Sequence, residues 1–237
     1  MQVQLDVVKE IEIDLSREGV LRALGSPSTN SNMAADLDRA IEEAERLAEP
    51  RALLRSLPID ETGRGRVVFA GGARITGKML PHLFDGADGG IFGLTTAGPG
   101  IEEAVRELFE AGDSLEAFVL DAAGSAIAMD ALTQIITDVV DELDRTGSKA
   151  GYCLVPGSSY WELSGQRAVF DALPTERIGV RLLDSMLMLP QKSQSVLIPF
   201  GKNIRVHGDP TASPCRTCNA VECPMRSEEF AGEITIP

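Results

Sequence analysis

Two stretches of the chain repeat apolar residues every three or four positions, which is the spacing of one face of an α-helix. Residues 34–48 form one such stretch, and residues 126–143 form a longer one. The polar positions between the apolar ones predict amphipathic helices that each bury one face. The apolar positions are Leu37, Ala40, Ile41, Ala44 and Leu47 in the first stretch, and Ile127, Ala131, Leu132, Ile135, Ile136, Val139 and Leu143 in the second.

Shorter patterns predict the remaining elements. Ser16 is a suitable N-cap for a helix over residues 17–24, and Gly25 is suited to end it. Glutamates at the start of residues 101–111 favour a helix there, because they lie near the positive end of its dipole. Two more helices are expected over residues 75–83 and 164–172. Strands are expected over residues 3–13, 67–70, 90–95, 117–121, 151–156, 185–189 and 195–199.

The order of these elements predicts an α/β (α+β) fold. The strands after residue 182 follow one another without helices, which favours a twisted mixed or antiparallel sheet over a doubly wound parallel one. We therefore expect a single domain over residues 1–205, with a sheet flanked by helices. Residues 206–237 are expected to form a cysteine-rich C-terminal tail.

Composition excludes several classes of partner. The formal net charge is −14 and no basic run offsets it, so nucleic acid is not expected as a partner. No stretch reaches the roughly 18 consecutive apolar residues of a membrane span, so no membrane is expected either. The first residues alternate apolar and polar side chains and carry acids, unlike a secretory leader. These features predict a cytoplasmic protein.

Three cysteines crowd near the end of the chain. Cys215, Cys218 and Cys223 form a C-x2-C-x4-C pattern, and three thiolates within nine residues can converge on one metal. Soft sulfur ligands select zinc or an iron–sulfur cluster such as 4Fe–4S, and the sequence does not separate the two. The fourth ligand is expected to be Cys153 or His207, or to be absent. Alternatively, these cysteines are free thiols that bind no metal.

The stretch over residues 149–193 resembles a known family. It contains Gly151-Tyr152, then Pro156, a helix, Ile178-Gly179-Val180, and finally a Leu-Asp-Ser-Met-Leu-Met-Leu-Pro strand that ends at Pro190. Lys192-Ser193 follows. In order and spacing these pieces resemble the activation domain of cobalamin-dependent methionine synthase and its small stand-alone relatives. Residues 20–25 and 120–125 also resemble those relatives, so the resemblance covers roughly residues 10–200.

The resemblance implies the fold of that activation domain and a pocket for S-adenosylmethionine. It places Ala150, Gly151 and Tyr152 beside the ligand, and Asp141 or Glu142 at the ligand's ammonium group. Ala150 stands where the family has a proline. Gly147 stands where the family has an arginine that holds the ligand's carboxylate, and Arg145 or Lys149 are the candidates to replace it.

The resemblance also implies partners. Cobalamin would be carried by a methionine synthase or another corrinoid methyltransferase, and residues 185–193 would face the corrin. The implied function is reductive methylation of cob(II)alamin, which requires a low-potential electron donor such as ferredoxin or flavodoxin. An iron–sulfur cluster in the tail would suit an electron relay.

The residue types suit this ligand. A tyrosine ring attracts a sulfonium cation by a cation–π interaction of about 1–2 kcal/mol when desolvated, and a glycine lets a ligand approach the backbone. Alternatively, Tyr152 is a core tyrosine. The competing function is a redox or metal-binding adaptor, with iron–sulfur or zinc in its tail, that does not bind S-adenosylmethionine. Asp121 and Ser125 have no nearby histidine, so hydrolase chemistry is not expected.

Overall fold

The computed structural model describes residues 6–25, 34–158, 160–206, 209–211, 214–216, 222–223, 226 and 228–232. His207 and Cys218 lie outside these residues. One antiparallel sheet runs through the molecule in the order β4-β3-β2-β5-β9-β6, and β1 also pairs with β2. Its strands are β1 (Asp6–Glu10), β2 (Arg51–Gly63), β3 (Arg66–Phe69), β4 (Arg74–Thr76), β5 (Gly89–Thr96), β6 (Lys149–Ala150) and β9 (Ser193–Gly201). The hairpin of β7 (Arg181–Leu182) and β8 (Met188–Leu189) is separate.

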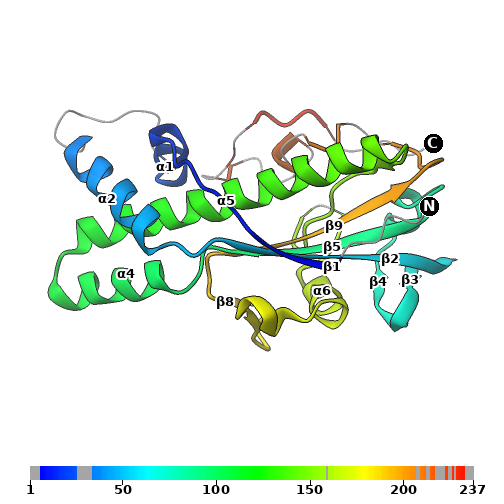
Figure 1. The fold of residues 1–237 in the computed structure, drawn as a ribbon, viewed down its shortest axis with the longest axis horizontal. Coiled ribbons are helices and arrows are strands. Elements are labelled where there is room, and N and C mark those ends of the chain that lie inside the picture. The colour runs from blue at the N-terminus through cyan, green and yellow to red at the C-terminus, as the bar shows by residue number, and fades with distance from the viewer. Residues whose placement is uncertain are drawn as a thin grey trace.

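Helices cover both faces of this sheet. In Figure 1, α5 (Ser114–Arg145) crosses one face diagonally, whereas α6 (Gln166–Ala172) and β8 lie on the other. Every residue of β5 is buried, as expected for a strand enclosed on both sides. The remaining helices are α1 (Arg17–Ala23), α2 (Ala34–Leu47), α3 (Leu80–Leu83) and α4 (Gly100–Ala111).

The long helix α5 belongs to two cores. Its C-terminal half packs Ile135, Val139 and Leu143 against β5 and β9. Its N-terminal half extends beyond the sheet, where α1, α2 and α4 surround it (Figure 1). None of the described helices combines the length and hydrophobicity that crossing a bilayer requires.

Several expected elements take a different form. Residues 117–121, expected as a strand, belong to α5. Ala117, Val119 and Leu120 are buried, whereas Phe118 is exposed, so the apolar side chains occur on all sides of the helix and show no one-faced helical pattern. Residues 75–83 split into β4 and the single turn α3. Within residues 185–189 only Met188 and Leu189 are extended. Residues 51–63, for which no element was expected, form the longest strand, β2.

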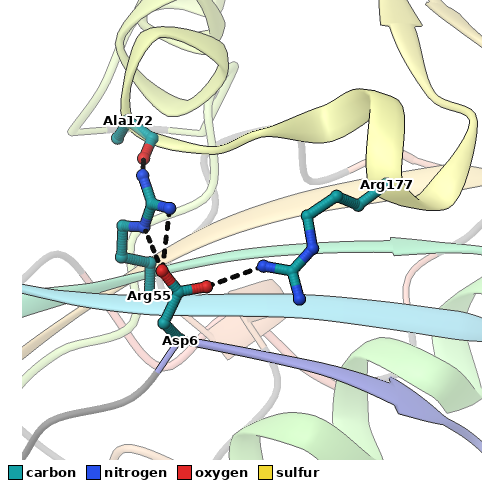
Figure 2. A network of polar contacts seen from close by, with 4 residues as sticks. All are labelled: Asp6, Arg55, Ala172 and Arg177. Atoms are coloured by element: carbon teal, nitrogen blue, oxygen red, sulfur yellow. Dashed lines mark hydrogen bonds and ion pairs between the residues drawn. The ribbon is translucent and has the colours of Figure 1, made fainter.

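A charged network joins the sheet to the segment after α6. The Asp6 carboxylate on β1 accepts hydrogen bonds from Arg55 Nη2 at 2.8 Å and from Arg177 Nη1 at 2.8 Å (Figure 2). Arg55 also donates to the Ala172 carbonyl at the end of α6, at 3.0 Å. The hydrogen bond from Arg55, supported by Arg177, lowers the pKa of the Asp6 carboxyl below its usual value. This network therefore holds three separate segments together.

Candidate functional site

The Gly151–Tyr152 turn follows directly from the end of α5. Gly147 has a φ of +75°, which reverses the chain after the helix at a residue that has no side chain to clash. Lys149 and Ala150 then pair with the end of β9, and Gly151 N donates to the Pro199 carbonyl at 2.7 Å. The turn is therefore held against the last residues of β9.

Gly151 is buried, and a side chain at this residue would meet close neighbours. A β-carbon added at this residue would lie 2.7 Å from Cδ1 of Ile204 and 3.1 Å from Cβ of Pro199. The space next to the α-carbon is thus filled by the protein's own side chains. The sequence suggested that Gly151 lets a ligand approach the backbone. The structure adds a second reason for a small residue, which is the close packing of Ile204 and Pro199.

Tyr152 is half-buried and pairs with Tyr160. The two ring centroids are 5.6 Å apart and the rings stand nearly perpendicular, at 87°. These are the chain's two tyrosines. Both rings pack at the edge of the core cluster that contains Leu154 and Trp161. Sequence analysis did not identify Tyr160. The only feature that could have indicated it is a second aromatic residue a few positions after Tyr152.

The two acids assigned to the ligand's ammonium lie near the end of α5. Asp141 is exposed. Glu142 forms an ion pair with Arg145, one of the two candidates to replace the missing arginine, so Arg145 already has a partner. Leu143 of the same helical turn shares a core cluster with Ala150, so this helix end packs beside the Gly151–Tyr152 turn. Lys149, the other candidate for the missing arginine, is exposed.

The segment expected to face the corrin lies at the opposite end of β9. Ser193 begins that strand, and Gly151 lies beside Pro199, six residues further along. An extended strand rises about 3.3 Å per residue, so these points are about 20 Å apart. Residues 185–193 and the Gly151–Tyr152 turn therefore lie near opposite ends of β9 and not in one place.

Cys153 is buried directly after the turn. It is 6% exposed, and its thiol donates to the Pro210 carbonyl at 3.1 Å. Burial, with a further contribution from Asp209, raises the pKa of the Cys153 thiol to about 12. The neutral thiol is thus the stable form here, and a metal would have to displace its proton. Residues 209–211 lie over this cysteine.

The described part of the tail contains two of the three clustered cysteines. Cys223 is exposed and Cys215 is partly exposed. Arg226 N donates to the Cys223 carbonyl at 3.1 Å, and the Arg226 guanidinium donates to the Cys215 carbonyl. Within the described residues, no three metal-ligating side chains gather into one cluster. The expected third ligand, Cys218, and the candidate fourth ligand, His207, lie outside those residues.

Comparisons with known proteins extend this description. No protein-family model matches the sequence, and no curated protein matches it. Among solved structures, the chain is similar to a crystal structure of the MetH reactivation domain bound to AdoHcy, with a TM-score of 0.60. The two share 14% sequence identity over 87% of this chain and 82% of that one. The expected α/β fold, an antiparallel sheet flanked by helices in a single domain, is confirmed: this chain has a reactivation-domain-like fold.

Proposed function

We propose that this protein binds S-adenosylmethionine at the Gly151–Tyr152 turn and supports the reductive methylation of cob(II)alamin on a partner protein. The observation that carries the proposal is the similarity in fold to a reactivation domain that was solved with AdoHcy, the product left when S-adenosylmethionine gives up its methyl group. The partner would be a methionine synthase or another corrinoid methyltransferase.

The residues near the turn offer the groups that this ligand needs. The half-buried ring of Tyr152 can attract the sulfonium, and Tyr160 holds that ring in place. Asp141 offers a carboxylate for the ammonium group, and exposed Lys149 offers a cation for the ligand's carboxylate. Ala150 would present its backbone to the ligand. Glu142 would act only after releasing Arg145.

The reaction would transfer a methyl group from sulfur to cobalt. A low-potential donor such as ferredoxin or flavodoxin supplies one electron to the partner's cob(II)alamin, the sulfur–methyl bond breaks as the cobalt–carbon bond forms, and S-adenosylhomocysteine leaves. The residues of this chain would hold the sulfonium in line for that transfer, so positioning is their main contribution.

Ligand titration tests this proposal. Isothermal titration calorimetry with S-adenosylmethionine should give saturable binding to the wild type. Tyr152→Leu should weaken it about 5- to 30-fold, as expected when a cation–π contact of about 1–2 kcal/mol is lost, whereas Tyr152→Phe should retain most of it. Trp161, buried and next to Tyr160, offers a second readout through its fluorescence. No binding, or equal binding by the Leu variant, would contradict the proposal.

A second candidate function is a metal-dependent adaptor built on the tail. Arg226 contacts the carbonyls of both Cys215 and Cys223, which brings these two peptide groups to one residue. Cys218 and either Cys153 or His207 would complete a zinc or iron–sulfur site. Metal and acid-labile sulfide analysis of anaerobically purified protein tests this, with a Cys215/Cys218/Cys223 triple serine variant as the control. Equal metal content in both proteins would exclude the tail site.

A further inference from the structure

In the part of the chain that the structure describes, two buried side-chain oxygens have no hydrogen-bond partner. They are Oγ of Ser158 and Oε1 of Gln166. Gln166 is the first residue of α6 and is only 6% exposed. A buried acceptor without a donor destabilises a fold, and most such atoms in proteins find a partner. These two oxygens therefore indicate that something outside the chain completes their surroundings.

Both oxygens belong to residues that lie around one buried tryptophan. Trp161, which is 2% exposed, accepts a backbone hydrogen bond from Gly157 at 2.8 Å and donates one to the Ser158 carbonyl at 3.3 Å. A β-carbon added at Gly165 would lie 2.2 Å from Trp161 Nε1, so the indole lies against the residue just before Gln166. Ser158 and Gln166 are thus brought to the same side chain.

The same tryptophan connects these oxygens to the proposed ligand site. Tyr160 directly precedes Trp161, and its ring centroid lies 5.6 Å from that of Tyr152. Both tyrosine rings are half-buried, and both pack against the core cluster that contains Trp161. Two aromatic rings and two oxygens without partners therefore belong to one neighbourhood.

An adenine base matches this combination of groups. Its faces stack on aromatic rings, and its edge carries an amino group that donates beside a ring nitrogen that accepts. A glutamine amide is a common partner of this edge, because its oxygen accepts from the amino group. A serine hydroxyl can donate to the ring nitrogen. Water is the competing occupant, because it also satisfies buried polar groups.

We infer that Gln166 and Ser158 recognise the adenine of the bound ligand. The Gln166 amide oxygen accepts a hydrogen bond from the 6-amino group, and the Ser158 hydroxyl donates to the neighbouring ring nitrogen. The inference rests on the proposed function for the rest of the ligand, S-adenosylmethionine, and adds the groups that select its base. Because both oxygens are enclosed in the free protein, the base reaches them only when side chains around Trp161 rearrange. Binding should therefore change the fluorescence of Trp161.

A pair of nucleosides tests the contact with the base. The first is 5′-methylthioadenosine, which lacks the sulfonium and the amino acid, and the second is its analogue with hydrogen in place of the 6-amino group. In calorimetric titrations, wild type should bind the first at least about fivefold more tightly, because the analogue leaves the amide oxygen unpaired. Gln166→Met should bind the two nucleosides within about twofold of each other. It should also bind S-adenosylmethionine at least about fivefold more weakly than wild type does.

Unfolding without ligand distinguishes a ligand contact from a structural one. Methionine is close to glutamine in size and removes the unpaired oxygen, so Gln166→Met should have a urea midpoint equal to or above that of wild type. Ser158→Ala should combine weaker binding with unchanged stability in the same way. The matched control is Gln134→Met on α5, where the amide already donates to the Glu12 carbonyl at 3.4 Å. This control should bind every probe with wild-type affinity and have a midpoint no higher than that of wild type.

Several results would overturn this assignment of the base contacts. Equal affinity of wild type for the two nucleosides, or no binding of either, would do so without any variant. Unchanged binding by Gln166→Met together with a lower urea midpoint would assign the amide oxygen to a buried water. Equal weakening by Gln134→Met would show that the loss is not specific to Gln166. A wild type that selects the adenine nucleoside but does not bind S-adenosylmethionine would refute only the proposed function.

Discussion

The ammonium of Lys192 lies 2.8 Å from the carboxylate of Asp121, which ties the start of β9 to the long helix α5. The lysine stem reaches this position across Gly124, where an added β-carbon would lie 3.3 Å from Lys192 Cε. The ammonium also donates to Ser125 Oγ at 2.9 Å, and its side chain is only 12% exposed. The glycine in the middle of α5 therefore makes room for a nearly buried cation.

Replacing this lysine should destabilise the fold. Lys192→Met keeps the stem and removes both charged contacts, so the free energy of unfolding should fall by about 1–3 kcal/mol. Urea denaturation followed by circular dichroism measures the change. Lys202→Met, at an exposed lysine just beyond β9, is the control and should stay within about 0.5 kcal/mol of wild type. Equal effects at the two lysines would show that the Asp121 contact contributes nothing.

Gly151→Ala should lower stability because of the contact with Ile204. The new β-carbon would overlap Ile204 Cδ1, the far end of a side chain that can shift, and would lie 3.1 Å from Pro199 Cβ. The cost should therefore lie at the lower end of the range of about 1–3 kcal/mol for overpacking. Ile204→Ala alone should also destabilise, because it leaves a cavity. In the double variant the overlap disappears, so the two effects should be less than additive by about 0.5 kcal/mol or more. Strictly additive effects would show that the contact with Ile204 is not the reason why Gly151→Ala lowers stability.

Cys153 should resist alkylation in the folded, metal-free protein. Iodoacetamide reacts with the thiolate, and at pH 8 the buried thiol with its pKa of about 12 stays protonated beneath residues 209–211. Exposed Cys223 should therefore react about 100-fold faster or more, as measured by mass spectrometry of the tryptic peptides. In concentrated urea the two rates should converge. Rapid labelling of Cys153 without denaturant would mean that the tail does not cover it.

The Asp6 network should make stability depend on acid pH. Because Arg55 and Arg177 lower the folded pKa of Asp6 below its ordinary value of 3.8, its contribution is present above that value and is lost as the pH falls through the folded pKa. Asp6→Asn should therefore lower the urea midpoint at pH 7, and the difference from wild type should shrink below about pH 4. Asp60→Asn, on the exposed end of β2, is the control. A difference that persists unchanged at pH 2 would contradict this assignment.

Secondary structure was predictable where one face of an element is buried and the other is exposed to solvent. The C-terminal half of α5 packs on the sheet with one stripe, so its periodicity could be seen in the sequence. The N-terminal half packs against α1, α2 and α4, and its apolar residues occur on all sides of the helix, which led to the wrong prediction of a strand over residues 117–121. The strand β2 was missed because its burial is uneven, with a buried start and an exposed end.

The candidate site was predictable only where its parts adjoin in sequence. Ala150, Gly151 and Tyr152 were proposed because they adjoin in a stretch that resembles a known family, and their role stays a prediction. Tyr160 could not be proposed in this way, because its pairing with Tyr152 depends on how the chain between them folds over the core. The same is true of the cover over Cys153, where the contact with Pro210 spans 57 residues. No local pattern encodes such a contact.

Taken by itself, the sequence determined the fold class and the acidic net charge, since these follow from residue type and local spacing. The assignment of a sulfonium ligand to Tyr152 stays a prediction. Tertiary structure alone decided that Ile204 occupies the space beside Gly151, that Lys192 crosses Gly124 to reach Asp121, and that residues 185–193 lie at the far end of β9 from Tyr152. The physical reason is that close packing and strand register depend on which segments meet, and that is settled only when the whole core forms.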